Sequence, residues 1–305
     1  GRAPQFTTHL FQEPWTFWLP KKAEIFHSLA QRPAPFHFRN EVVTVNDVFP
    51  LVGRGYSTPE FQRRFSALLL EAVKRAARVI TPSQYSAAQL CKYAGARSAK
   101  IRVIPDGVDI PAQRLGPEAR FRERERWVGP GNELVLVVGV IQTRKNTLGA
   151  LRSLGRLPDR YRMVLAGGNG YGSGAAHDFM RESGLSSRVI VAGHVTSSQL
   201  AALYECATVF LFPSFEEGFG LPVLEAMAYG LPVVASNTAS LPEVGGEAAL
   251  YANPNDEIEI ADRVLKATQD KSLRQRMIAA GVSRARQFPW SLTAQRTLQV
   301  YEELL

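Results

Sequence analysis

A glycine-rich segment between residues 214 and 228 carries the residues best suited to bind an anion. It reads Ser-Phe-Glu-Glu-Gly-Phe-Gly-Leu-Pro-Val-Leu-Glu-Ala-Met-Ala and follows an apolar run typical of a buried strand. Gly218 and Gly220 permit close approach of a ligand to the backbone, and Pro222 fits the first position of a helix. The N-terminus of that helix offers free N–H groups and a positive dipole end, which together attract a phosphate.

Two glutamates flank this helix N-terminus. Glu217 precedes the helix, and we expect Glu225 to lie in its first turn. Carboxylates repel phosphates but accept hydrogen bonds from hydroxyls. A nucleoside diphosphate sugar, with phosphates in the middle and hydroxyls at both ends, satisfies both requirements. The structural alternative is a glycine-rich turn before a helix with an acidic cap, which strand-to-helix connections often use.

A second positive element, Arg144 and Lys145, lies in the loop 139–146 after the first strand of the same domain. A guanidinium fork and an ammonium group suit a diphosphate leaving group. Two adjacent basic residues in a loop are also commonly just solvated. The pair therefore indicates a diphosphate site only when it is considered together with the glycine-rich segment.

Continuous apolar strands alternate with helix-length segments from Glu133 onward. This pattern predicts a doubly wound α/β domain with a parallel sheet covered on both faces. The expected strands are 134–138, 163–166, 189–191, 208–212 and 232–235, the expected helices are 197–206 and 221–230, and the chain after Pro254 is expected to be helical. The first part of the chain predicts strands at 41–45, 78–81 and 100–104, with an amphipathic, basic helix at 61–77.

These elements predict two Rossmann-like domains that face a cleft. The expected boundaries are 1–110 for the first α/β domain, 111–132 for a linker rich in Gly, Pro and charge, 133–288 for the second domain, and 289–305 for a C-terminal helix that crosses back to the first domain. Ligands of such sheets bind at the carboxyl ends of the strands, so we expect the site in the cleft.

Composition narrows the class of protein. The 305 residues are 45% hydrophobic and 21% charged, a balance that allows two buried cores. No run of eighteen apolar residues occurs, the start lacks the pattern of a signal peptide, and two cysteines make no disulfide framework. We therefore expect a cytoplasmic location, peripheral at the inner membrane face.

The excess positive charge lies in the first part of the chain. Residues 1–120 contain 17 Lys and Arg against 9 Asp and Glu, whereas the remainder is balanced. The basic helix at 61–77 would suit an anionic membrane. The alternative is that its apolar stripe packs on its own sheet while the charges keep the protein soluble.

Several motifs together resemble the retaining glycosyltransferases of family 4, which have the GT-B fold, and most of all their mannosyltransferase-like branch. The resemblance covers the chain from about residue 23 onward. It rests on Glu217 and Glu225 with seven residues between them, and on the segments 104–109, 144–146, 230–237 and 240–244.

The resemblance implies transfer of a hexose, mannose, from a nucleoside diphosphate sugar such as GDP-mannose to a polysaccharide or lipid-linked acceptor. The family retains the anomeric configuration and uses no bound metal or cofactor, and no Asp-x-Asp motif occurs here. Glu217, Lys145 and Arg144 would be catalytic. The implied donor-binding residues are Glu225, Gly218, Phe219, Gly220, Leu221, Gly193, His194 and Val195, the acceptor-side candidates are Asn46 and Asp47, and no nucleic acid is expected as a partner.

The sequence departs from the family pattern in three places. Val140 stands where many members have Arg, and Asn46 stands where they usually have His. The strand–helix–strand region that usually precedes residue 23 is not present, so the first domain is expected to be incomplete. Two other functions stay open: a non-catalytic nucleotide-sugar-binding or scaffold protein, and a GT-B sugar-nucleotide epimerase.

Overall fold

Two parallel β-sheets form the framework of the protein. The structure, a computed structural model, describes residues 23–29, 38–53 and 55–305. The first sheet has the strand order β1-β2-β3-β4 and the second the order β10-β9-β8-β5-β6-β7, and every neighbouring pair is parallel. The predicted α/β class with two parallel-sheet domains is therefore confirmed.

The second domain holds the larger sheet. Its strands are β5 (Glu133–Val138), β6 (Tyr161–Ala166), β7 (Val189–Gly193), β8 (Val209–Phe212), β9 (Val233–Ser236) and β10 (Ala249–Ala252). Its helices are α4 (Pro117–Val128), α5 (Thr147–Leu154), α6 (Ser173–Glu182), α7 (Ser197–Cys206), α8 (Leu221–Ala228), α9 (Leu241–Gly245), α10 (Glu257–Gln269) and α11 (Lys271–Ala285).

Strand β5 is apolar at successive positions because both of its faces are buried. Leu134 and Leu136 enter the core that α7 and α8 share, whereas Val135 and Val137 enter the core on the opposite face, with α5 and α10. Successive side chains of a strand point to opposite faces, so a sheet buried on both faces requires apolar residues at every position.

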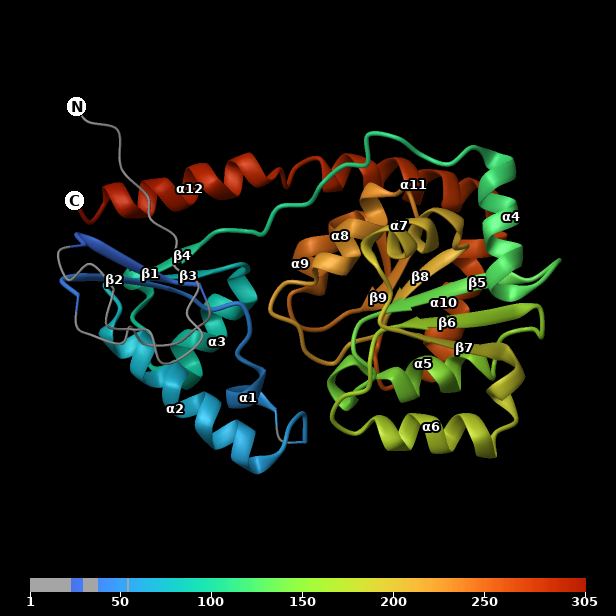
Figure 1. Ribbon diagram of the computed structural model, residues 1–305, viewed down its shortest axis with the longest axis horizontal. Coiled ribbons are helices and arrows are strands. Elements are labelled where there is room, and N and C mark those ends of the chain that lie inside the picture. Colours follow the sequence, from blue (N-terminus) through green and yellow to red (C-terminus); the bar gives the residue numbers. More distant parts are fainter. Residues whose placement is uncertain (1–22, 30–37, 54) are drawn as a thin grey trace.

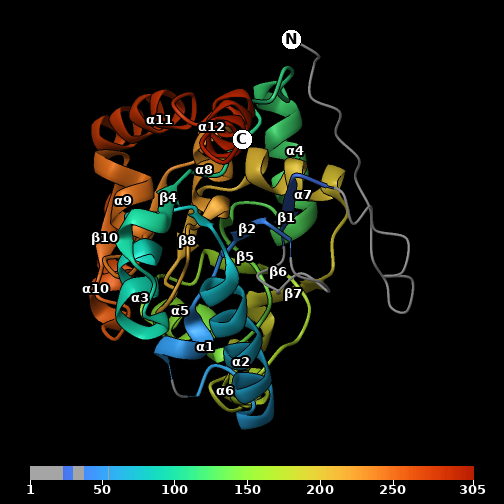
Figure 2. The same ribbon diagram turned by 90° about the vertical axis from the view of Figure 1, so that its left-hand side faces the viewer.

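The first domain is built from both ends of the chain. Its elements are β1 (Ile25–Ser28), β2 (Asn40–Thr44), α1 (Phe49–Val52), α2 (Pro59–Arg75), β3 (Arg78–Thr81), α3 (Gln84–Ala94) and β4 (Ile101–Val103). Helices α2 and α3 cover one face of its sheet. The C-terminal helix α12 (Trp290–Glu302) covers the other face, where Val300 packs on Val42 and Ile80 (Figures 1 and 2).

Polar contacts also hold α12 on the first domain. The imidazole of His27 lies 2.6 Å from the Tyr301 hydroxyl and 2.8 Å from the Thr44 hydroxyl. Burial lowers the pKa of His27 to about 4, so the ring is neutral near neutral pH. Glu303, just beyond α12, pairs with Arg78 and Arg102.

The structure places a helix in the segment that we expected to be a linker. Residues 117–128 form α4, which packs against α7 and β5 of the second domain. The residues that suggested a linker mark the ends of this helix: Gly116 precedes it, Pro117 opens it and Gly129 ends it with a positive φ of 81°.

Helix α2 buries its apolar stripe, with Leu69, Ala72 and Val73 packed into the core of the first domain. Phe61 and Leu70 remain 47% and 40% exposed. Within the part of the chain that the structure describes, no helix is long and apolar enough to span a membrane.

Candidate functional site

The site lies where the order of the second sheet reverses. Strands β5 and β8 are neighbours, but the chain leaves β5 toward β6 on one side and leaves β8 toward β9 on the other. The loops that follow β5 and β8 therefore diverge and leave a crevice at their carboxyl ends, the usual ligand position in such sheets. Figure 1 shows these ends directed toward the first domain.

Glu217, Lys145 and Arg144 meet at this point. The Nζ atom of Lys145 lies 2.7 Å from Oε1 of Glu217, and a terminal nitrogen of Arg144 lies 3.1 Å from Oε2. Burial alone would raise the pKa of Glu217, but the two cations outweigh it and hold the pKa below its usual value. The three residues predicted to be catalytic thus form one buried, charged cluster.

The loop after β5 is shaped by Asn146, which adopts a left-handed conformation with φ 53°. Its side-chain amide donates to the carbonyls of Pro213, 3.1 Å away, and Pro254, 2.7 Å away, and its oxygen accepts from Gly149 N–H and so caps α5. These bonds tie the β5 loop to the β8 loop, and they place Lys145 with its ammonium group 4.7 Å from the centre of the Phe212 ring.

The glycine-rich segment turns into α8 at Gly220. Gly220 stands at the N-cap of α8 with φ 101°, and no side chain caps this helix. Leu221 is the first helical residue, so Pro222 lies one position later than we expected. Phe219 is buried against Phe288, and the Ser240 hydroxyl fixes the segment by donating to the carbonyls of Glu217 and Phe219. Pro222 has no N–H and Val223 N–H donates to the Gly220 carbonyl, so the Leu221 N–H and the positive dipole end of α8 remain for an anion.

Glu225 is the fifth residue of α8, which puts it in the second turn and not in the first. The Tyr204 hydroxyl of α7 donates to its Oε2 atom over 2.8 Å. Burial and the Glu225 carboxylate raise the pKa of Tyr204 well above its usual value, so the phenol stays a donor. This bond leaves Oε1 of Glu225 for a further donor.

The segment 193–195 follows β7 at the edge of the sheet, away from the charged cluster. His194 is exposed, whereas Val195 packs against the core that contains α8. No hydrogen bond or ion pair joins the described atoms of this segment to Glu217. The three residues share the carboxyl edge of the sheet with the site, but they do not form part of its charged core.

The acceptor-side candidates reach the site from the first domain. The Asp47 carboxylate accepts a hydrogen bond from Gly218 N–H over 3.0 Å and lies 3.9 Å from Arg144. Burial raises the pKa of Asp47, with Glu217 adding to the rise and Arg144 opposing it. A Cβ at Gly218 would overlap the carbonyl oxygen of the exposed residue Asn46, so this contact between the domains requires glycine.

Several residues at this junction were not predicted. Glu216 accepts from the Tyr85 hydroxyl over 2.7 Å, and the Phe49 ring lies under the Arg144 guanidinium, 4.7 Å from its centre. Burial raises the pKa of Glu216 to about 7 although the Tyr85 bond lowers it. Glu216, the first glutamate of the Glu-Glu pair, was the available signal, because a buried carboxylate almost always has a partner.

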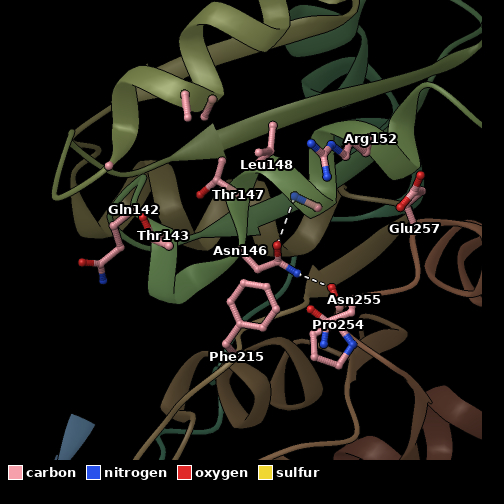
Figure 3. A pocket seen from close by; sticks show the side chains of 14 residues that line it. Gln142, Thr143, Asn146, Thr147, Leu148, Arg152, Phe215, Pro254, Asn255 and Glu257 are labelled. Carbon is pink, nitrogen blue, oxygen red and sulfur yellow. Dashed lines mark hydrogen bonds between the residues drawn. The ribbon is translucent and has the colours of Figure 1, made fainter. Parts of the chain in front are cut away.

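A cavity of about 230 Å³ lies beside the site, between α5, α6 and the residues 254–257 (Figure 3). Asn146, Phe215 and Arg152 are among its lining residues. None of the predicted donor or acceptor residues lines it. The predicted site and this cavity are therefore neighbouring but separate features of the second domain.

The fold and the site together define a class of protein, the GT-B glycosyltransferases. Residues 120–284 match the family described as "Glycosyl transferases group 1", and residues 25–111 match "Glycosyltransferase Family 4". The chain belongs to the group 1 glycosyltransferases, and the predicted resemblance to family 4 is confirmed.

Curated relatives place it near mannosyltransferases. The chain is 31% identical to O-antigen chain mannosyltransferase B of Escherichia coli over 280 residues, 88% of this chain and 72% of that protein. It is 32% identical to the serotype-specific mannosyltransferase WbdA of Escherichia coli over 275 residues, but spans only 33% of that protein. HepE of Anabaena, solved with UDP and glucose, shares the fold with a TM-score of 0.76 at 22% identity, over 87% of this chain and 72% of HepE.

Proposed function

We propose that this protein transfers mannose from a nucleoside diphosphate sugar, GDP-mannose, to a polysaccharide or lipid-linked acceptor with retention of anomeric configuration. The observation that carries the proposal is the Glu217 carboxylate paired with Lys145 and Arg144 at the point where the sheet order reverses, directly before the uncapped N-terminus of α8. The identity of about 31% to an O-antigen mannosyltransferase supports the choice of mannose.

The donor diphosphate would lie at the N-terminus of α8. Its charge would be neutralised by the positive dipole end of α8 with the Leu221 N–H, and by Lys145 and Arg144, without a bound metal or a cofactor. Both cations are paired with Glu217 in the structure, so the diphosphate would share or replace that carboxylate as their partner. The leaving group gains negative charge as the bond to the sugar breaks, and fixed cations stabilise that change.

The two glutamates would hold the two ends of the donor. Glu225, whose Oε1 atom is not used by Tyr204, would accept hydrogen bonds from the ribose hydroxyls. Glu217 would orient the mannose ring, whose anomeric carbon gains positive character during transfer. The acceptor would enter from the first domain, near Asn46 and Asp47, because these residues face the Gly218 peptide.

Calorimetric titration of the full chain with GDP-mannose, UDP-glucose and the free nucleotides tests the proposal. We expect GDP-mannose and GDP to bind with similar affinity and the uridine compounds to bind more weakly, and we expect GDP to be released when an acceptor is added. Binding without acceptor-dependent release would favour a non-catalytic binding protein. Conversion of the donor to an isomeric sugar nucleotide would favour an epimerase.

We also propose peripheral contact with an anionic membrane through the first domain. One side of α2 exposes Leu70 beside Arg63 and Lys74, whereas the exposed Phe61 lies on the opposite side of the helix. Each cation near an anionic surface contributes about 1 kcal/mol of binding, and this contribution is screened by salt. Flotation with liposomes at low salt should recover more protein on anionic than on neutral vesicles, and equal recovery would contradict the proposal.

A further inference from the structure

The backbone N–H and the backbone carbonyl of Gly218, the residue after Glu217, both form hydrogen bonds with the first domain. Its N–H donates to Asp47, and its carbonyl accepts from the Ser83 hydroxyl over 2.6 Å and from the Ser86 hydroxyl over 2.9 Å. Both serines are fully buried. The backbone directly after the central glutamate of the site is therefore held by residues from another domain.

Glu216, the residue before Glu217, is also held by the N-terminal turn of α3. The Tyr85 hydroxyl donates to Oε2 of Glu216, which is as buried as Glu217. Ser83 is the N-cap of α3, and Tyr85 and Ser86 lie in its first turn. The N-terminus of α3 thus fixes Glu216 and Gly218, and the chain between these two residues is Glu217 alone.

The second domain in turn provides hydrogen-bond acceptors for the first N–H groups of α3. The Glu243 carboxylate of α9 accepts from Gln84 N–H over 2.8 Å and from Tyr85 N–H over 3.2 Å. Ser86 N–H donates to the Ser83 hydroxyl. The first N–H groups of a helix have no partner within the helix, and a carboxylate there is favoured by the helix dipole. The contact is therefore reciprocal, since each domain satisfies polar groups of the other.

We propose that Ser83, Tyr85 and Ser86 are positioning residues for glycosyl transfer, which hold Glu217 in the orientation that turnover requires. The inference rests on the proposed function. It separates two properties of the protein: the second domain alone supplies the nucleotide-binding groups, whereas the docked N-terminus of α3 sets the geometry of Glu217. Loss of the α3 contacts should therefore lower the turnover number and leave nucleotide affinity unchanged.

The test compares Tyr85→Phe and the double variant Ser83→Ala/Ser86→Ala with the wild type and with Tyr93→Phe. Tyr93 lies on the same helix, is exposed and has no hydrogen bond to the second domain among the described contacts, so it is the matched control. The Tyr85 bond to a partly ionised Glu216 lies between neutral and charge-assisted hydrogen bonds, at roughly 1.5 kcal/mol, which corresponds to about tenfold. We expect kcat of Tyr85→Phe to fall by about tenfold or more, with the Kd for GDP within about twofold of wild type.

Hydrogen exchange supplies a readout that does not depend on activity. The amides of residues 216–219 should exchange faster in the serine double variant than in Tyr93→Phe, because the Gly218 carbonyl loses both of its hydroxyl donors and the segment opens more often. Unchanged exchange at these amides, or unchanged kcat in the variants of an active wild type, would overturn the inference alone. Failure of the wild type to transfer any sugar would overturn the proposed function and this inference with it.

Discussion

Replacement of Glu217 by glutamine tests whether the charged cluster is built around this carboxylate. The side chain keeps its shape and loses its charge, so Lys145 and Arg144 lose a partner at 2.7 and 3.1 Å. At an effective dielectric constant of about 20, each contact corresponds to a gross attraction of about 5–6 kcal/mol, which desolvation largely offsets. Breaking a buried ion pair from one side costs about 3–5 kcal/mol net.

We expect the lower end of that range, about 3 kcal/mol, because Arg144 retains a hydrogen bond to the Glu216 carbonyl and lies near Asp47. A domain of about 150–250 residues loses about 2–4 °C in Tm for each kcal/mol, so the expected loss is roughly 6–12 °C by scanning calorimetry. GDP should narrow the gap between Glu217→Gln and wild type, because its diphosphate offers the unpaired cations a new partner.

The neighbouring variant Glu216→Gln is the matched control. Glu216 is equally buried, but its pKa of about 7 leaves it partly protonated near neutral pH, and its described partner is the neutral Tyr85 hydroxyl. We expect its Tm to fall by less than half as much as that of Glu217→Gln. Equal losses in the two variants, or a larger gap between Glu217→Gln and wild type when GDP is present, would refute the reasoning.

Three further predictions concern other parts of the site and of the fold. Glu225→Ala should weaken GDP and GDP-mannose binding alike, by about 10- to 150-fold in calorimetry, because the ribose contact is the same in both ligands. The control Tyr204→Phe keeps the Glu225 carboxylate and should bind both ligands nearly as wild type does. Unequal loss of affinity for the two ligands in Glu225→Ala would contradict the assignment of Glu225 to the ribose. Because the pKa of buried His27 is lowered to about 4, the unfolded chain binds its proton first, so the stability that a neutral His27 contributes should be lost as pH drops from about 6.5 to 4. The raised pKa of Glu216 acts in the opposite direction in wild type and variant alike, so the test is their difference. In urea unfolding, the stability of wild type minus that of His27→Gln should shrink across this interval, and a constant difference would contradict the prediction. Asn46→His should raise the rate of mannose transfer if the usual histidine reads a sugar hydroxyl, whereas a wild-type preference for a 6-deoxyhexose donor would show that Asn46 matches a different sugar.

Strands β5 to β9 of the second domain were predictable because burial on both faces leaves a continuous apolar signal. Strand β10 was not predicted, since Ala249–Ala252 is short and contains two alanines and a tyrosine. Strand β1 was also missed, because its Ile-Phe-His-Ser sequence mixes apolar and polar residues at an edge of the sheet.

The site residues that the second domain supplies could be predicted, because they lie directly after predicted strands. Arg144, Lys145 and Glu217 each follow a predicted strand of the same sheet, and parallel strands bring such loops to one edge. The contribution of α3 was not predictable from local pattern. Ser83 and Gly218 are 135 positions apart and belong to different domains, so their contact depends on how the domains dock.

The position of a bound donor shows whether the N-terminus of α8 and the Glu217 cluster form the donor site. A crystal structure of the full chain with GDP-mannose should show the diphosphate at the N-terminus of α8 within hydrogen-bonding distance of Lys145 or Arg144, the ribose at Glu225 and the mannose at Glu217. A nucleotide bound instead in the cavity between α5 and α6 (Figure 3), with the ion pairs of Glu217 intact and Glu225 still bonded only to Tyr204, would show that the donor site lies elsewhere.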